Sequence, residues 1–200
     1  YFGVGDYNKL DYNREYCVWI HMLERHTEEM RMKKPSLMSY EYSSICNEWY
    51  NYQNFAEWYH SYITSLNPDF YKVYELDKDI LQWNRLYKVY SPDTCCIVPK
   101  EINICLCGVY TKDRELPTGV VKIDNWKIPK YRANTHTSYG GICKTIGHYD
   151  TPEEAFNAYV KAKKERLCYL ADKYYSINAI KKEVYDALYN LEILPYGNDE

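Results

Sequence analysis

The sequence predicts an α+β fold in which a largely helical N-terminal region precedes a three-stranded antiparallel sheet packed on a helix. Three observations support this prediction: apolar residues at helical spacing before residue 65, three short β-type runs between residues 119 and 149, and a helix-start signature at Thr151. The 200 residues are 46% hydrophobic, which is enough to bury a core in one large domain or two small ones.

The N-terminal region begins with a helical pattern and continues into a polar segment. Between residues 15 and 29, apolar side chains recur at the i, i+3, i+4 and i+7 spacing of one helix face, namely Tyr16, Trp19, Ile20 and Leu23. Residues 30–39 are polar and basic and include Pro35, so they predict a connecting loop.

A dense aromatic segment follows at residues 45–62. Its large rings stand partly in helical register: Trp49, Phe55, Trp58, Tyr59 and Tyr62. Such a stripe is typical either of a hydrophobic core or of a platform on which nucleic-acid bases stack. We favour the core, because aromatic residues at helical spacing more often face the interior of a protein.

The second half of the chain predicts a sheet followed by helices. The strands are expected at residues 119–123, 126–135 and 142–149, with turns between them. Thr151 is expected to cap a helix, with Pro152 in its first turn and Glu154 completing a capping box. Ala155, Tyr159 and neighbouring apolar residues then form the helix face that covers the sheet, and residues 180–191 predict a further helix.

Cations gather in the segment that contains the predicted sheet. Between residues 108 and 144, Lys and Arg outnumber Asp and Glu, although the whole chain has a formal net charge of -3. This distribution indicates a local phosphate-contacting patch on an acidic protein. The candidate DNA contacts are Lys122, Trp126, Lys127, Lys130, Arg132 and Lys144. Strand alternation places Lys130 and Arg132 on one face, for which an ordinary solvated surface is the alternative interpretation.

The stretch from residue 74 to residue 103 holds the side chains most suggestive of chemistry. Asp77 and Asp79 are two apart, so on a strand they would face the same side, and their oxygens suit Mg²⁺ or Mn²⁺. The alternative interpretation is a plain strand with solvated charges, with Asn103 capping or starting a helix.

The cysteines favour free thiols over a metal site. The chain has 8 cysteines, and Cys95, Cys96, Cys105 and Cys107 cluster in the sequence. Adjacent and CxC spacings lack the CxxC geometry of zinc knuckles, so we expect buried thiols and no structural zinc.

The central stretch resembles the ββα-metal core of phage-type HNH homing endonucleases, in the LDKDI sequence at residues 76–80 and the SPDTC sequence at residues 91–95. Residues 19–25 and 48–58 also resemble the region that precedes this core. The resemblance implies a catalytic group of Asp77, Lys78, Asp79 and Asn103, in which Asp77, Asp79 and Asn103 hold the divalent cation. Lys78 stands where the family has the histidine that deprotonates water, and a lysine with a pKa of about 10 is a poor base at neutral pH.

The second half resembles an APETALA2-type DNA-binding domain over most of residues 110–172. The resemblance lies in the GVV sequence at residues 119–121, YRA at 131–133, the Gly147-x-Tyr149 pattern and TPEEA at 151–155. It implies that a three-stranded sheet enters the DNA major groove.

These observations predict two regions, a helical region with a degenerate HNH-like core at residues 1–107 and an APETALA2-like domain with a C-terminal helix at residues 108–200. The expected function is sequence-selective binding of double-stranded DNA with metal-dependent phosphodiester cleavage, the core being either active or vestigial. A catalytically silent phage DNA-binding regulator and a phage protein that inhibits a host protein are the alternatives. We expect no membrane partner, because no apolar run reaches the roughly 20 residues of a spanning helix, and we expect location in the cytoplasm of an infected bacterial host.

Overall fold

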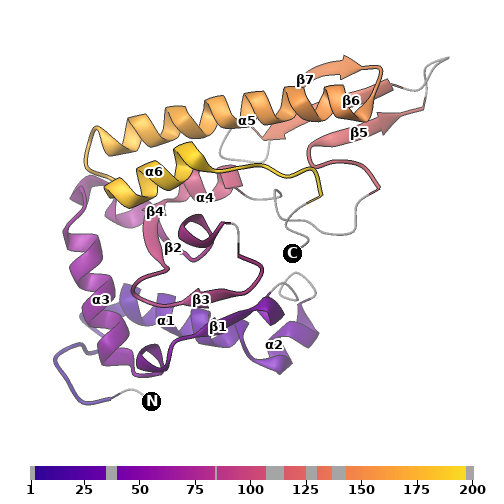
Figure 1. Ribbon diagram of the computed structural model, residues 1–200. Helices are drawn as coiled ribbons and strands as arrows, with labels where there is room; N and C mark the ends of the chain where they lie inside the picture. Colours follow the sequence, from indigo (N-terminus) through magenta and orange to yellow (C-terminus); the bar gives the residue numbers. More distant parts are fainter. Residues whose placement is uncertain are drawn as a thin grey trace. The chain divides into compact units, whose positions relative to one another are not determined.

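The computed structural model describes residues 3–34, 40–83, 85–106, 115–124, 130–136 and 143–196. The chain divides into two compact units, Tyr1–Ile97 and Val98–Glu200, each of which is considered by itself (Figure 1). The fold is α+β, as predicted, whereas the predicted boundary between residues 107 and 108 stays a prediction. Among the described residues, no helix is both long and apolar enough to cross a membrane.

Helices and short 3₁₀ turns make up most of the first unit. The α-helices are α1 (Asn13–Arg25), α2 (Glu28–Lys33) and α3 (Tyr52–Thr64). The 3₁₀ turns are η2 (Asn47–Tyr50), η3 (Pro68–Val73) and η4 (Ile80–Gln82). The predicted loop at residues 30–39 was therefore wrong at its start, because the Thr27 side chain caps α2 by accepting a hydrogen bond from the Met30 N–H.

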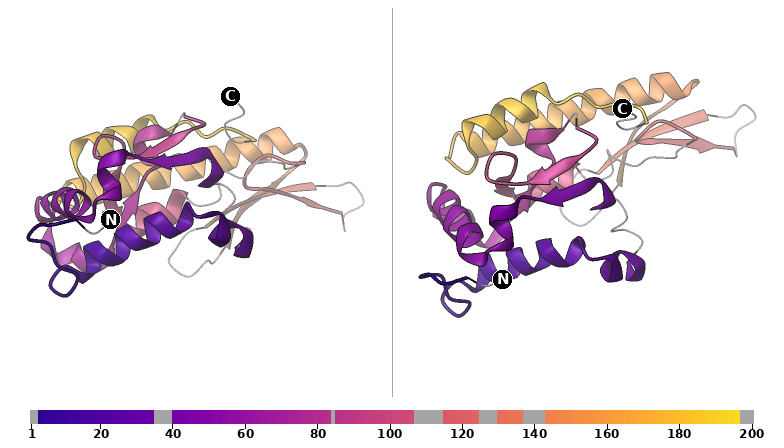
Figure 2. Two further views of the ribbon diagram at one scale, coloured as in Figure 1. Left: turned by 90° about the horizontal axis from the view of Figure 1, so that it is seen from below. Right: turned by 60° about the horizontal axis from the view of Figure 1, so that its bottom comes forward.

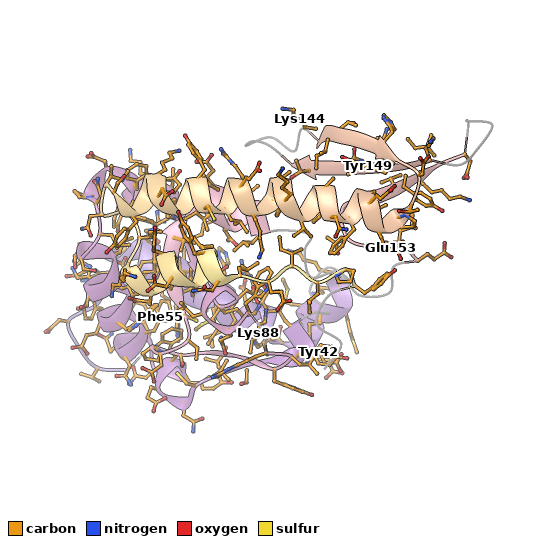
Figure 3. All side chains as sticks on the ribbon, turned by 45° about the horizontal axis from the view of Figure 1, so that its top comes forward. Tyr42, Phe55, Lys88, Lys144, Tyr149 and Glu153 are labelled. Atoms are coloured by element: carbon orange, nitrogen blue, oxygen red, sulfur yellow. The ribbon has the colours of Figure 1, made fainter. Side chains whose placement is uncertain are left out.

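The aromatic segment forms the core of the first unit, as predicted. Trp49, Tyr52, Phe55 and Tyr59 are each 0% exposed, and Phe55 is labelled among the packed side chains in Figure 3. The ring of Phe55 packs edge-on against Trp49, with 5.0 Å between centroids, and at 5.7 Å from Tyr59. This interlocked arrangement of rings accounts for the density of aromatic residues in the sequence.

The buried face of α1 is displaced from the predicted one. Its buried residues are Glu15, Trp19 and Met22, whereas Tyr16, Ile20 and Leu23 are only partly buried. Contacts to distant residues explain the difference. The Trp19 indole Nε1 donates to the Trp49 carbonyl oxygen at 2.7 Å, and Glu15 Oε1 lies 3.4 Å from His60 Nδ1.

Two small sheets complete this part of the fold. Strand β1 (Ser43–Ile45) runs parallel to β3 (Lys88–Tyr90), with Ser43 opposite Lys88 and Ile45 opposite Tyr90. Strand β2 (Tyr74–Asp77) pairs with β4 (Cys96–Pro99), and helix α4 (Lys100–Leu106) begins directly after β4. A single strand that contains both Asp77 and Asp79 was predicted, but β2 ends at Asp77, so Asp79 lies outside it.

The second unit contains the predicted sheet and its covering helix. Strands β5 (Val120–Ile123), β6 (Lys130–His136) and β7 (Cys143–Tyr149) form an antiparallel sheet in that order. Helix α5 (Pro152–Tyr175) runs along one face of this sheet, and α6 (Lys182–Asn190) packs beside the C-terminal half of α5 (Figures 1 and 2). The helix predicted at residues 180–191 is α6.

The start of α5 is fixed by the predicted capping box. Thr151 Oγ1 accepts from the Glu154 N–H at 3.2 Å, and Glu154 Oε2 accepts from the Thr151 N–H at 3.2 Å. Tyr159 of α5 then packs against the backbone at Gly119, whose φ is +79°. A Cβ at that position would lie 2.2 Å from the Tyr159 ring, so both the backbone conformation and the contact require glycine.

Candidate functional site

The Asp77 carboxylate closes the turn that follows β2. Its Oδ1 accepts hydrogen bonds from the backbone N–H groups of Asp79 and Ile80, each at 2.7 Å. Asp77 is 5% exposed. Burial, followed by the nearby charge of Asp79, raises the pKa of Asp77 to about 6. Asp77 therefore acts structurally as the cap of a buried turn and is partly protonated in mildly acidic solution.

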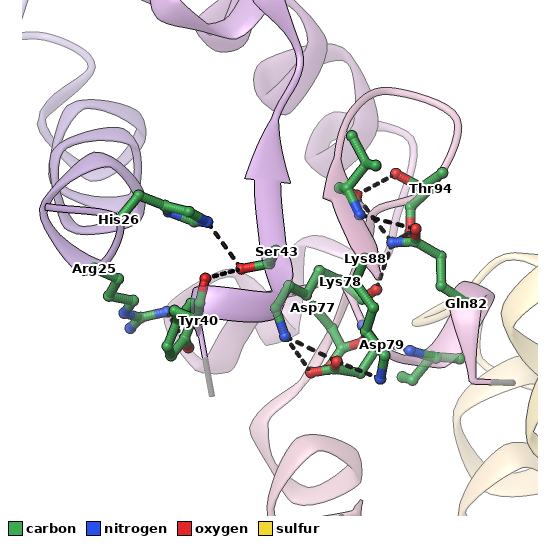
Figure 4. A network of polar contacts seen from close by, with 12 residues as sticks. Arg25, His26, Tyr40, Ser43, Asp77, Lys78, Asp79, Gln82, Lys88 and Thr94 are labelled. Carbon is green, nitrogen blue, oxygen red and sulfur yellow. Dashed lines mark hydrogen bonds and ion pairs between the residues drawn. The ribbon is translucent and has the colours of Figure 1, made fainter. Parts of the chain in front are cut away.

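The Asp79 carboxylate lies between two lysines from different parts of the first unit. The Lys78 Nζ lies 2.8 Å from Asp79 Oδ1 and 3.0 Å from Oδ2, and the Lys88 Nζ lies 2.7 Å from Oδ1 (Figure 4). Burial raises the pKa of Asp79, but the attraction of the two ammonium groups outweighs it and leaves the pKa below the ordinary value. Burial lowers the pKa of Lys88.

Gln82 joins this cluster to the edge of β3. Its Nε2 donates to the carbonyl oxygens of Val89 at 2.9 Å and Lys78 at 2.8 Å, and its Oε1 accepts from the Val89 N–H at 3.0 Å. Sequence reasoning did not select Lys88 or Gln82 as site residues. A lysine inside an otherwise apolar short strand was the signal that could have identified Lys88.

As the two aspartates are arranged, most of their interactions are with backbone N–H groups and lysines of the first unit. One oxygen of Asp77 already accepts two backbone N–H groups, and the Asp79 oxygens face two ammonium groups that supply the neutralising charge. Asn103 lies on α4, in the second unit. Among the described residues, no group of three or more His, Cys, Asp or Glu side chains is placed to hold a metal. The metal set Asp77, Asp79 and Asn103 stays a prediction.

The cysteine cluster is thiol-rich and buried. Cys95, Cys96 and Cys105 are buried thiols that form no disulfide, and Cys107 lies outside the described residues. Burial raises the pKa of the Cys95 thiol well above its ordinary value. The Cys95 thiol is therefore a poor nucleophile.

The outer face of the β5-β6-β7 sheet is the candidate nucleic-acid interface. Val120 and Ala133 are opposite each other and buried, which places them on the face covered by α5. Alternation then places the neighbouring row, Val121, Arg132 and His148, on the opposite face. Val121 is 43% exposed, so this face presents an apolar methyl surface beside cationic groups.

The predicted DNA-contacting cations of the sheet differ in their ion pairing and exposure. Lys122 pairs with Asp124 at 2.9 Å, Lys130 pairs with Asp150, and Lys144 is exposed at the start of β7 (Figure 3). Trp126 and Lys127 lie outside the described residues. The structure thus brings Lys130 and Arg132 to one face, as alternation predicted.

Arg132 stands at the centre of the outer face. It is on the middle strand, between Val121 and His148, and its Nε is buried without a hydrogen-bond partner in the part of the chain that the structure describes. Asn134, a residue that sequence reasoning missed, follows on the same strand and accepts from the Thr145 hydroxyl at 3.3 Å. A polar residue two positions beyond Arg132 was the available signal.

A carboxylate-centred cluster links α4 to α5 within the second unit. Glu101 accepts from Arg166, from Lys173 Nζ at 2.8 Å and from the Tyr174 hydroxyl at 2.6 Å. Burial raises the pKa of Glu101, but the hydrogen bonds from Lys173 and Tyr174 outweigh it and lower the pKa overall.

No protein-family model, curated protein or solved structure matches this chain.

Proposed function

We propose that this protein binds double-stranded DNA with the outer face of the β5-β6-β7 sheet. The observation that carries the proposal is the position of Arg132 at the centre of that face, with Val121 and His148 on the flanking strands. Arginine carries several N–H donors, which favour a ligand that supplies acceptors. DNA offers such acceptors on its phosphates and on the edges of guanine.

The chemistry of the outer face suits the major groove. That groove admits strands, and within it arginine pairs with guanine, asparagine pairs with adenine and apolar side chains contact the thymine methyl group. The outer face offers Arg132 and Val121, and Asn134 follows on the same strand beyond a shift in the β6–β7 register. The resemblance to APETALA2-type domains, which use their sheet in this way, supports the same proposal.

The test is fluorescence anisotropy with a labelled library of duplexes, titrated at several salt concentrations. We expect Arg132→Ala to weaken binding about tenfold or more and to reduce the salt slope by about 1. Lys182→Gln is the matched control, because Lys182 is an exposed cation of the same unit on α6, with a side chain that is 61% exposed. Equal losses in the two variants, or no duplex affinity at low salt, would refute the sheet as the interface.

Metal-dependent strand cleavage stays a separate prediction. It is tested by conversion of supercoiled plasmid in Mg²⁺, Mn²⁺ or EDTA, with Asp77→Ala as the control variant. Metal-dependent nicking that is lost in Asp77→Ala would show that the Asp77 turn opens to accept a cation. Unchanged nicking would remove Asp77 from the reaction.

A further inference from the structure

Ser43 and His26 form a hydrogen-bonded pair outside the aspartate cluster. Ser43 is the first residue of β1, and its Oγ lies 3.0 Å from His26 Nε2 (Figure 4). The other ring nitrogen, His26 Nδ1, lies 2.8 Å from the carbonyl oxygen of Met22. Nucleophile, base and a third group that orients the base are the geometric elements of an activated serine.

The Met22 carbonyl fixes the tautomer of His26. A carbonyl oxygen only accepts, so Nδ1 carries the proton and donates it, which leaves a lone pair on Nε2. The Ser43 hydroxyl has one proton and two acceptors within reach, His26 Nε2 and the Tyr40 carbonyl oxygen, which is also at 3.0 Å. In the structure the hydroxyl donates to the Tyr40 carbonyl oxygen, and rotation about the Cβ–Oγ bond would turn its proton to the His26 Nε2 lone pair.

The charged groups around His26 keep it neutral. Burial lowers the pKa of His26, the hydrogen bond to Met22 raises it, and the positive charges of Lys78, Arg31 and Arg25 lower it further. The net pKa is below the ordinary value, so the ring is a base at neutral pH. Both His26 and Ser43 are half-buried, so they remain in contact with solvent.

Two cations lie beside the ring of Tyr40, the residue whose carbonyl oxygen contacts Ser43. The Lys78 Nζ is 5.1 Å from the centroid of the Tyr40 ring, and the Arg25 Cζ is 5.7 Å from it. Arg25 also donates to the Tyr40 hydroxyl at 3.4 Å. Lys78 is paired with Asp79, so Arg25 is the cation of this group that would favour an anionic substrate and stabilise charge on the oxygens of a phosphoryl group during its transfer.

We propose that Ser43 is a nucleophile that attacks phosphodiesters, with His26 as its general base and Arg25 as the cation that binds a phosphoryl oxygen. The Ser43 Oγ–P bond forms as a P–O ester bond of the nucleic acid breaks. The serine proton passes to His26 Nε2 and then to the leaving oxygen, so the step needs neither metal nor redox partner. The choice of DNA as the substrate rests on the proposed function of the sheet.

The first experiment measures reactivity without DNA. The full chain is treated with a fluorophosphonate probe, and the modified residue is located by mass spectrometry. We expect labelling at Ser43, at least tenfold slower in His26→Gln, with a rate that rises with pH and levels off near or below pH 6.5 as His26 loses its proton. Ser44→Ala and His21→Gln are matched controls, because Ser44 and His21 are exposed neighbours on β1 and α1.

The outcomes separate activation from folding. An unmodified Ser43, or a rate in His26→Gln equal to that of the original chain, would overturn the proposal. If His26→Gln does not fold, the pH profile of the unsubstituted chain decides, and a rate that keeps rising above about pH 7 would also overturn the proposal, because a His26 whose pKa is lowered has already lost its proton there.

The second experiment identifies the substrate. Supercoiled DNA is incubated with the protein in EDTA, and covalent protein–DNA adducts are sought after denaturation in detergent. We expect an adduct that Ser43→Ala abolishes and Ser44→Ala retains. A reactive Ser43 that leaves no adduct on DNA bound by the same preparation would overturn the phosphodiester as substrate. Loss of duplex binding alone counts against the sheet interface, and the fluorophosphonate result still decides the role of Ser43.

Discussion

Each unit holds one carboxylate between two cations, and the two clusters differ in the burial of the cations. The side chains of Asp79 and Glu101 are both 26% exposed. Around Asp79 the lysine side chains are 13% and 10% exposed, whereas around Glu101 Arg166 is 32% and Lys173 is 39% exposed. The exposed fractions of the two carboxylates are equal. We therefore expect the burial of the cations to determine how much stability is lost when the ion pairs are broken.

The largest effect is expected for Asp79→Asn. The substitution removes the Asp79 charge from the nearly buried Lys78 and Lys88 ammonium groups, and we expect the free energy of unfolding to fall by about 3–5 kcal/mol. Urea unfolding followed by tryptophan fluorescence measures it, since Trp19, Trp49, Trp58 and Trp83 all belong to the first unit. A loss below about 1 kcal/mol would mean that water reaches both lysines and that the contrast between the clusters is absent.

The next largest effect is expected for Asp77, where a substitution raises the free energy of unfolding instead of lowering it. Its folded-state pKa of about 6 exceeds the ordinary value of 3.8, so folding disfavours the charged form. The stability that Asp77 contributes is complete below pH 3.8 and is lost as the pH rises through 6.

We therefore expect Asp77→Asn to stabilise the protein by about 2 kcal/mol at pH 7 and by less at pH 5, because the amide oxygen still accepts the two backbone N–H groups. Unfolding curves at the two pH values test it, and Asp77→Ala, which removes the cap, should destabilise at both. Destabilisation by Asn at pH 7 would show that the charge of Asp77 is favourable in the folded state.

A smaller loss is expected for Glu101→Gln. Arg166 and Lys173 remain solvated when the carboxylate is neutralised, so we expect a loss of about 1 kcal/mol in the second unit. Thermal unfolding by circular dichroism at 222 nm, a wavelength that reports helix, gives the value. A loss as large as that of Asp79→Asn would remove cation burial as the explanation of the difference.

The smallest effect is expected for Asp186→Asn on α6. Asp186 pairs with Lys182 one turn away, and the two side chains are 50% and 61% exposed. Such pairs contribute about 0.3–0.5 kcal/mol, so the variant sets the baseline against which the two clusters are compared. The same circular dichroism measurement applies, and a loss above about 1 kcal/mol would point to an interaction of Asp186 other than this pair.

The second unit could be predicted from the sequence because its signals are local. The capping residues Thr151 and Glu154 are three apart, and the strands of the sheet follow one another along the chain. The same alternation correctly placed Lys130 and Arg132 on one face. In both cases the residues that decide the structure lie within a few positions of each other.

The first unit was harder to predict because its decisive contacts are long-range. The Asp77 and Asp79 pair looked like one face of a strand, but β2 ends at Asp77 and Asp79 turns toward Lys88, from a strand that pairs with β1. The buried face of α1 also differs from the predicted one at Glu15, whose carboxylate lies near His60, a residue 45 positions away. Neither contact leaves a periodic pattern in the sequence.

The parallel pairing of β1 with β3 has a consequence for biosynthesis. Ser43 pairs with Lys88, so β1 leaves the ribosome long before its partner has been translated. During that interval β1 has an open edge, and its pairing depends on a late segment of the nascent chain. β6 and β7 are consecutive and antiparallel, so the interval between the translation of the two strands is much shorter. Slow translation between codons 45 and 88 would therefore prolong the exposure of β1 to pairing with other nascent chains.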